Sequence, residues 1–228
     1  MSPFGSCGAI DVLVHFAGSW PNFRLAELDA VAETVGAKLR LDPAAVAEFE
    51  ARLHLDTCES LLLPVQVSDA AGAARIAARC VLVKECMHVW ASGASWEALA
   101  ARLRAYPREL AEPYLLRGST FRVNVTSVGK RLSDEERLAY IKALGPLLPW
   151  QGKVRMKGAD HVFTIVVDFT RAIGLVGPVG GGVAADDAGV EPRGEARGAA
   201  AAPHFHFARR VAEGRRDLVG KYDLKRRK

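Results

Sequence analysis

The alternation of hydrophobic and polar residues is clearest in the segment that ends near residue 170. His161 to Phe169 reads HVFTIVVDF, and in an extended chain its largest apolar residues fall on one face: Phe163, Ile165, Val167 and Phe169. Val162 and Val166 fall on the other face. A strand that is apolar on both faces is typical of the centre of a sheet, so the pattern predicts a central strand here.

Residues 10–92 predict a small unit in which strands and helices alternate. The expected strands are Ile10–Ala17, Ser60–Val67 and Val81–Trp90, and the expected helices are Phe23–Val35, capped by Asn22, and a short helix through Arg79, capped by Asp69. Pro64 cannot donate to a strand ladder, which assigns its strand to a sheet edge. Asp42 and Pro43 can open a further helix through Leu53. The order β-α-β-α-β is that of a ferredoxin-like half.

A second unit follows this one. Ser95 caps a helix that Pro107 ends, and Ser119–Thr126 alternates as a half-buried strand. Ser133 and Glu136 form a capping box for a helix whose expected core face is Leu138, Ile141 and Leu144. The central strand and His204–Val211 complete the sheet. Between these two strands, residues 171–202 hold eight glycines without periodicity, which predicts an exposed low-complexity insert.

Composition places the chain among ordinary globular proteins. It has 228 residues, of which 50% are hydrophobic and 25% charged, and no apolar run approaches the roughly 20 residues that a spanning helix needs. The four cysteines include no C-x-x-C pair, so neither a zinc knuckle nor a redox motif is predicted. Reduced thiols in an intracellular, cytoplasmic protein are the expectation.

The net charge of +5 is concentrated in two blocks. Residues 1–114 hold ten Lys and Arg against fourteen Asp and Glu, whereas residues 115–160 hold nine against four and residues 204–228 nine against three. Lys153, Arg155 and Lys157 recur at period two, so in an extended segment all three side chains would leave from one face. This pattern favours an anion platform, although a merely solvated surface remains open on charge alone.

Two other features suggest chemistry only weakly. Gly180 to Gly182 imitate a nucleotide-binding loop, but no strand precedes them and no helix start follows. His204 and His206 share one strand face, as two metal ligands must, yet no carboxylate or cysteine lies close in sequence to complete a site. Stacking on RNA or a place on the sheet surface is the favoured interpretation of these histidines.

Four segments carry a resemblance to a known family: NFRLAELDAVAE (22–33), GSTFRVNV (118–125), QGKVRMKGADHVFTIVVDFT (151–170) and PHFHFARRVAEGRRDLVGKYDLKRRK (203–228). They resemble the N-terminal half of the catalytic subunit of eukaryotic tRNA (guanine-10-N2)-methyltransferase. The resemblance implies an α+β fold with an N-terminal ferredoxin-like domain at 1–92, a THUMP RNA-binding domain at 93–211, interrupted by the insert at 171–202, and a basic linker at 212–228.

The resemblance also implies a division of labour. The family uses S-adenosylmethionine, held by a glycine-rich loop, and an Asn/Asp-Pro-Pro-Tyr/Phe motif that orients the guanine amine, and neither motif occurs in this sequence. Glu112-Pro113-Tyr114 is the nearest string. We therefore expect no metal site, no bound cofactor and no methyl transfer by this chain alone. The implied partners are tRNA and, through a catalytic domain not present here, a small zinc-binding activator subunit.

The resulting prediction is a tRNA-binding module that grips tRNA for a methyltransferase. The residues predicted to contact RNA are Lys130, Arg131, Arg155, Lys157, Arg209, Arg210, Lys225, Arg226 and Arg227. Two alternatives stay open. The module could belong to another tRNA-modifying enzyme such as a thiouridine synthase, or it could be a stand-alone RNA-binding or scaffold protein.

Overall fold

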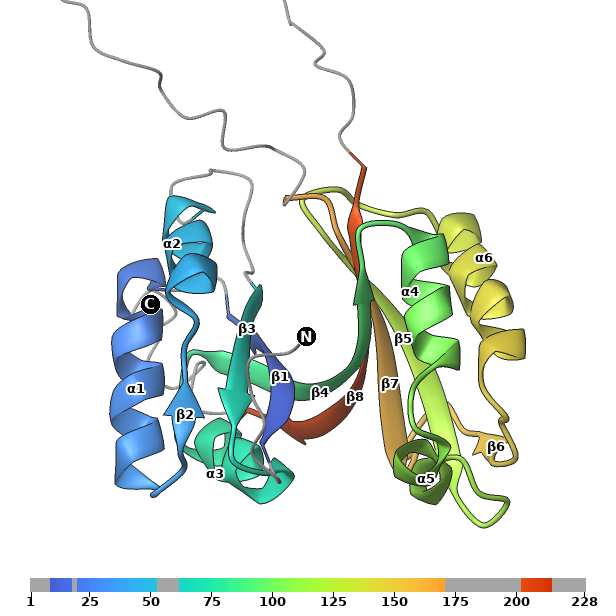
Figure 1. Ribbon diagram of the computed structural model, residues 1–228, viewed down its shortest axis with the longest axis horizontal. Coiled ribbons are helices and arrows are strands. Elements are labelled where there is room, and N and C mark those ends of the chain that lie inside the picture. Colours follow the sequence, from blue (N-terminus) through green and yellow to red (C-terminus); the bar gives the residue numbers. More distant parts are fainter. Residues whose placement is uncertain (1–8, 18–19, 53–61, 171–201, 215–228) are drawn as a thin grey trace, which may run out of the picture.

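A computed structural model of the chain describes residues 9–17, 20–52, 62–170 and 202–214. Within these ranges, strands gather in one mixed sheet, in the order β2-β3-β1-β4-β8-β7-β5-β6 (Figure 1). They are β1 (Ile10–Phe16), β2 (Leu39–Arg40), β3 (Leu62–Val67), β4 (Val83–Gly93), β5 (Thr120–Val128), β6 (Lys153–Val154), β7 (His161–Asp168) and β8 (His204–Glu213). Neighbours are antiparallel except that β5 runs parallel to both β7 and β6.

The helices flank this sheet in two groups (Figure 1). The α-helices are α1 (Arg24–Thr34), α2 (Pro43–Arg52), α3 (Ala70–Arg79), α4 (Trp96–Arg104), α5 (Arg108–Ala111) and α6 (Asp134–Leu144), and the 3-10 turns are η1 (Pro21–Phe23), η2 (Glu112–Tyr114) and η3 (Gly145–Leu147). We call β1–β3 with α1–α3 the N-terminal half and β5–β7 with α4–α6 the C-terminal half. β4 and β8 belong to both.

β4 and β8 curve from one half into the other (Figure 1). Their pairing slips twice, between Cys86 and Met87 and between Val89 and Ala91, which leaves Val211 and Trp90 as the extra residues of two bulges. A bulge bends its strand and increases its twist, which allows one sheet to serve two separate cores. The predicted domain boundary at residue 92 falls within β4 and remains a prediction.

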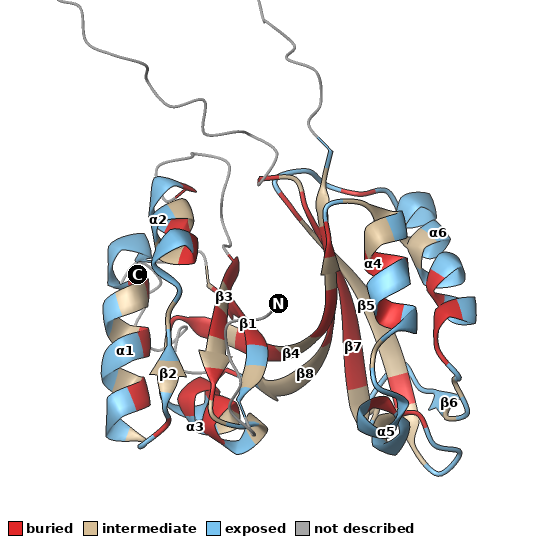
Figure 2. Cartoon of the chain, viewed as in Figure 1, coloured by how far each residue is buried: buried red, intermediate tan, exposed pale blue. Residues whose placement is uncertain are grey.

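Two large cores lie under the helices, and buried positions line the inward sides of both halves (Figure 2). The N-terminal core is mostly aliphatic and includes Val12, Leu28, Leu63 and Ile76, with Phe16 packed against Phe49. The C-terminal core is aromatic, built around Trp90, Phe121, Phe163 and Phe207. A third, smaller cluster lies on the opposite face of the sheet and contains Leu13, Met87, Val166 and Ala208.

The predicted central strand is confirmed. β7 lies between β8 and β5, and all its residues from Val162 to Asp168 are buried. Phe163, Ile165 and Val167 enter the aromatic core, whereas Val166 enters the cluster on the opposite face.

Helix starts were predicted well where a polar cap is present. Asp69 accepts a hydrogen bond from the Gly72 amide at 2.6 Å, and Ser95 accepts one from Ala98. The capping box of Ser133 and Glu136 is complete. The predicted Asn22 cap is wrong, because Asn22 lies inside the 3-10 turn η1 and α1 begins only at Arg24. Gly36, with a φ of 62°, follows the end of α1 as expected, since this conformation suits glycine.

The prediction of an edge strand at Pro64 is wrong for part of β3. The short strand β2 pairs with Gln66 and Val67, so this end of β3 has a neighbour on each side. Pro64 itself lies opposite Leu13 of β1 and is not paired with β2. On the side of β3 away from β1 it has no neighbouring strand among the described residues, so its missing N–H loses no hydrogen bond there.

The predicted core face of α6 is also wrong for two of its three residues. Leu144 is buried, but Leu138 is 49% exposed and Ile141 is 36% exposed. The middle turn of α6 instead packs Tyr140 against Trp96 and Phe205 of the aromatic core, so the helix buries the face of Tyr140 and Leu144 and turns Leu138 and Ile141 toward solvent.

A buried polar contact joins the two halves. Arg52, at the end of α2, donates to the Asp168 carboxylate at 3.3 Å and to the Thr170 hydroxyl at 3.0 Å. Asp168 also accepts from the Thr170 amide at 2.8 Å. Arg52 and Asp168 are both buried, so each charge depends on the other for solvation.

No helix in the described ranges is both long and apolar enough to cross a lipid bilayer.

Candidate nucleic-acid interface

The sheet separates the predicted RNA-binding residues into several groups. Lys153 lies in β6, and Arg155 and Lys157 follow it at the end of the sheet where β5 begins. Lys130 and Arg131 follow the other end of β5. Because Phe121 and Val128 are seven residues apart on β5, these two groups are separated by about 23 Å.

The predicted extended face of Lys153, Arg155 and Lys157 is wrong, because β6 contains only Lys153 and Val154. The Arg155 amide still donates to the Phe121 carbonyl at 2.9 Å, after which the chain bends through Gly158, whose φ is 64°. Where the chain returns toward β7, the Asp160 carboxylate accepts hydrogen bonds from the Thr120 amide and hydroxyl, which fixes the position of the turn. The three cations therefore project from a turn between β6 and β7 instead of from one strand face.

This turn is exposed in both its basic and its apolar residues. Lys153, Arg155 and Lys157 are all exposed, and between them Val154 is 69% and Met156 72% exposed. The sequence analysis overlooked the two apolar residues, although the alternation KVRMK shows them. Cations with apolar side chains between them suit RNA, which offers both phosphates and base surfaces.

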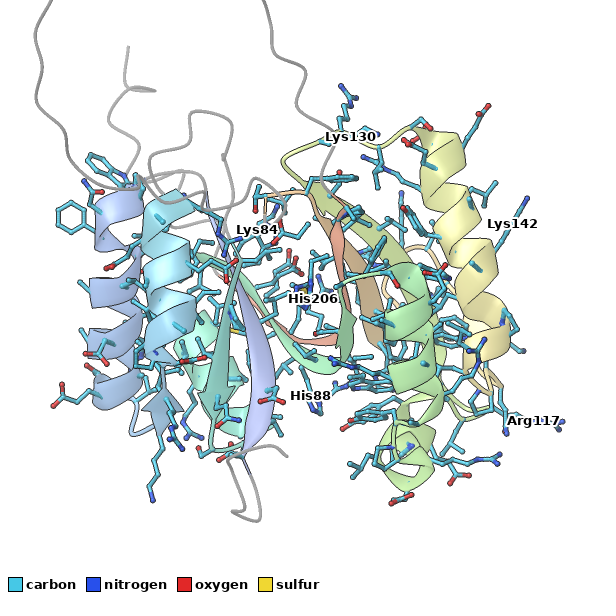
Figure 3. The ribbon with its side chains drawn as sticks, turned by 45° about the horizontal axis from the view of Figure 1, so that its top comes forward. Lys84, His88, Arg117, Lys130, Lys142 and His206 are labelled. Carbon is cyan, nitrogen blue, oxygen red and sulfur yellow. The ribbon has the colours of Figure 1, made fainter. Side chains whose placement is uncertain are left out.

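Two further arginines lie at this turn. Arg117 is exposed in the loop beside residues 151–153, whose amides bond to Leu115 and Ser119, and Figure 3 shows it at the outer end of the C-terminal half. Arg122 is half-buried and donates to the Met156 carbonyl at 3.2 Å, which fixes the turn. We name the exposed cations the β6 patch: Arg117, Lys153, Arg155 and Lys157.

The acid nearest the β6 patch stays ionised. Hydrogen bonds from Thr120 hold the pKa of Asp160 below its usual value, and nearby His161 and Arg155 act in the same direction. Residues 115–160 hold nine bases against four acids, so this part of the chain keeps a positive excess.

At the far end of β5 the charge is more nearly balanced. Lys130 lies 3.6 Å from the Glu136 carboxylate and 5.4 Å from the ring centre of Phe169. Arg131 is exposed. Glu136 keeps its charge, because its hydrogen bond to the Ser133 amide lowers its pKa. Lys130 therefore offers less free charge than the residues of the β6 patch.

Arg209 and Arg210 point to opposite faces of β8, as successive strand residues do. Arg210 lies opposite Met87 and donates to Glu213 at 3.0 Å. Arg209 lies opposite His88, and its guanidinium carbon is 3.8 Å from the ring centre of Tyr114. The remaining predicted residues, Lys225, Arg226 and Arg227, lie outside the described residues.

His204 and His206 do share one face of β8, with ring centres 4.7 Å apart. They line a groove of about 530 Å³, and His206 is 2.8 Å from the Ser92 hydroxyl. Two acids and two bases also line this groove, Asp11, Asp42, Arg40 and Arg102, so its charge does not select an anion. The described residues hold no group of three or more metal-ligating His, Cys, Asp or Glu side chains.

The described residues most similar to the expected catalytic motif have a packing role. Glu112-Pro113-Tyr114, the string nearest to the expected catalytic motif, forms the 3-10 turn η2. Tyr114 packs against Trp90, His161 and Arg209, so its side chain forms part of the edge of the aromatic core. Gly180 to Gly182 lie outside the described residues.

Comparison with known proteins identifies relatives of this chain. The family model described as "Tmrp11 THUMP N-terminal domain" matches residues 10–176. The mouse protein named tRNA (guanine(10)-N(2))-methyltransferase TRMT11 is 33% identical over 150 residues, which are 65% of this chain and 27% of that protein. The Dictyostelium discoideum protein of the same name is 24% identical over 225 residues, 95% of this chain and 40% of its own.

The matches therefore span about a quarter of the mouse relative and less than half of the Dictyostelium one. Among solved structures, PH1313 from Pyrococcus horikoshii aligns over 90% of this chain and 55% of its own, with a TM-score of 0.46 and 11% identity.

Proposed function

Because this chain belongs to the family of Tmrp11 THUMP N-terminal domains, we propose that it binds tRNA and holds it for methylation of a guanine N2 atom by a methyltransferase domain. The observation that carries the proposal is the β6 patch, an exposed and positively charged turn at one end of the sheet.

The proposed work of this chain is binding and orientation. Arg155 and Lys157, together with Arg117 and Lys153, contact phosphates, while Val154 and Met156 offer an apolar surface to the sugar or base beside them. The hydrogen bond from Arg122 to Met156 and those from Thr120 to Asp160 hold the turn in place, so less entropy is lost when RNA binds.

Other predicted residues extend this surface. Arg131 and Lys130 offer a second contact about 23 Å away along β5, which suits a ligand as long as tRNA. Lys225, Arg226 and Arg227 stay proposed contacts from the sequence alone. The division into a ferredoxin-like domain at 1–92, a THUMP domain at 93–211 and a linker at 212–228 likewise stays part of the proposal.

The chemistry of the whole enzyme is proposed to lie elsewhere. S-adenosylmethionine, when bound to the catalytic domain of the family, supplies the methyl group, and the zinc-binding activator subunit is proposed to act through that domain. This chain alone is therefore proposed to be inactive.

Titration of the purified chain into fluorescently labelled tRNA tests the proposal. We expect saturable binding that weakens steadily as salt rises, since released counterions drive phosphate binding. No binding at low salt would contradict the proposal. Incubation of the same samples with labelled S-adenosylmethionine should transfer no label, and turnover would show that the chain carries catalytic residues of its own.

A further inference from the structure

Arg209 is a partly buried cation at the seam between the two cores. It lies on the same face of β8 as Phe207, while Val211, two residues further on, already packs against the N-terminal core. Its Nε is buried without a hydrogen-bond partner, and within the described residues no carboxylate lies at ion-pair distance from its guanidinium.

Among the described residues, the Arg209 guanidinium thus has no counter-ion. Burial lowers the pKa of Arg209, which shows that its surroundings disfavour the charge. The Tyr114 ring at 3.8 Å stabilises the cation through its face, but a ring face cannot accept the several N–H bonds that a guanidinium offers. An anion with several oxygens would satisfy those donors.

Two histidines border the same position. His88 of β4 lies directly opposite Arg209, where side chains leave the sheet about 5 Å apart. His161 of β7 meets the Tyr114 ring edge-on, with centres 5.2 Å apart, and lies two residues before Phe163, the β7 partner of Arg209. Figure 3 shows His88 between the two halves. Both histidines and Arg209 remain partly exposed.

We propose that Arg209, His88 and His161 form a binding site for a phosphate group of RNA. The guanidinium, held over the Tyr114 ring, donates to two phosphate oxygens, and each imidazole donates an N–H from its side. The site lies three strand spacings, about 15 Å, from the β6 patch, so one RNA can contact both. That the phosphate belongs to RNA rests on the proposed function, whereas the anion site itself does not.

The histidines make this site dependent on pH. Burial first, and then the Arg209 charge, lower the pKa values of both His88 and His161. Asp11 near His88 and Asp160 near His161 act in the opposite direction and raise these pKa values. Neither carboxylate outweighs the lowering by burial and by Arg209. Burial raises the pKa of Tyr106, the second tyrosine near Arg209, so this group is neutral near pH 7. A bound phosphate attracts the protonated imidazoles and raises both pKa values, so binding strengthens as pH falls toward 6.

The first experiment follows the histidine ring protons by NMR during a pH titration, with and without inorganic phosphate. Phosphate should raise the pKa of His88 and His161, whose signals are assigned from H88Q and H161Q. The ring-proton signals of His15 should not move when phosphate is added, because His15 is buried beside Glu85 at 3.1 Å. The shifts should vanish in R209Q. Unchanged titration of both histidines in the wild-type protein would overturn the site.

The second experiment measures tRNA affinity between pH 8 and 6. Wild-type affinity should rise by up to about tenfold for each unit by which RNA raises a histidine pKa, while H88Q/H161Q should bind with little change over the same range. R209K, which keeps the charge but loses the guanidinium over the Tyr114 ring, should bind tRNA more weakly than wild type. The double histidine variant alters only partly exposed residues, so it tests the site even where R209Q fails to fold.

The two experiments separate the possible failures. If wild type binds tRNA but the histidine and Arg209 variants bind it equally at every pH, the RNA site is wrong and the proposed function survives. If phosphate shifts the histidines but wild type does not bind tRNA, the proposed function fails, and the RNA assignment of this site fails with it.

Discussion

The two halves of the sheet differ in how they are stabilised and in what they present to solvent. The N-terminal half packs aliphatic side chains under three helices, and residues 1–82 carry ten acids against six bases. The C-terminal half packs stacked and edge-on aromatic rings, and residues 115–160 carry nine bases against four acids. The strands β4 and β8 are common to both.

This difference indicates a division of roles within one sheet. The β6 patch lies at the open edge of the C-terminal half. The edge strand β6 has only two residues, which leaves little backbone for another strand to pair with. Large rigid rings beneath β5 and β7 keep that edge in place. The N-terminal half also carries exposed cations, including Lys38 and Arg40 at its edge strand β2, and it supports the shared strands from the other side.

The largest expected loss of unfolding free energy comes from removing a buried ring from either core. Phe163→Ala in the aromatic core and Phe49→Ala in the N-terminal core each remove a fully buried ring, which should cost about 3–5 kcal/mol of unfolding free energy. Because β4 and β8 are shared, both variants should still unfold in one transition. Urea denaturation followed by circular dichroism and by tryptophan fluorescence checks this, since Trp90 and Trp150 report on the aromatic core. Two separated transitions would show that the halves are independent domains.

The next effect concerns the contact between the halves. Asp168→Ala removes the buried carboxylate partner of Arg52 and leaves, among the described residues, only the partly exposed Glu48 at 3.9 Å, and we expect a loss of about 3 kcal/mol. The double variant R52M/D168A serves as the control, because it removes both charges and should be more stable than D168A alone. Equal stability of the two variants would mean that the ion pair does not hold α2 against β7.

A smaller change in the free energy of unfolding is expected at acidic pH, where Glu85 becomes protonated. The hydrogen bond from His15 holds the pKa of Glu85 below its usual value even though burial acts in the opposite direction. A depressed pKa in the folded state adds stability that is present above the unfolded pKa and is lost as pH falls through the folded one. Wild-type stability should therefore decline below about pH 4.5, and E85Q should decline less steeply. The urea unfolding midpoints of wild type and E85Q are measured from pH 6 to 3. An equal decline of both midpoints with pH would contradict a stabilising role of the His15–Glu85 pair.

The smallest stability effect is expected on α6. Leu138→Ala should change the unfolding free energy by about 0.5 kcal/mol, since the side chain is 49% exposed. Leu144→Ala on the same helix is the matched control and should cost about 2 kcal/mol or more, because Leu144 is buried. Thermal melting of both variants distinguishes them, and equal losses would mean that Leu138 packs after all.

The sequence predicted elements best where the signal was local. The caps at Asp69, Ser95 and Ser133 depend on residues three positions apart, and the apolar faces of β7 depend on simple alternation. Leu138 and Ile141 show the limit, because the spacing of apolar residues along a helix does not tell that Tyr140, beside Leu144, is the residue turned toward the core.

The candidate site shows the same limit. Period-two spacing identified Lys153, Arg155 and Lys157, but the turn at Gly158 and the bonds to Asp160 decide how they project. Arg209 looked like any other basic residue in a basic segment. Its place beside Tyr114, His88 and His161 depends on strand pairing between residues far apart in sequence, which no local pattern shows.

The central claim is that the C-terminal half binds tRNA through the β6 patch, and the salt dependence of affinity tests it most directly. R155A/K157A removes two exposed cations, so it should weaken tRNA binding and reduce the slope of log affinity against log salt by about 1.4–1.8, with stability unchanged within about 0.5 kcal/mol. K38A/R79A removes two exposed cations from the N-terminal half and should leave the slope unchanged. A wild-type slope in folded R155A/K157A would contradict the claim.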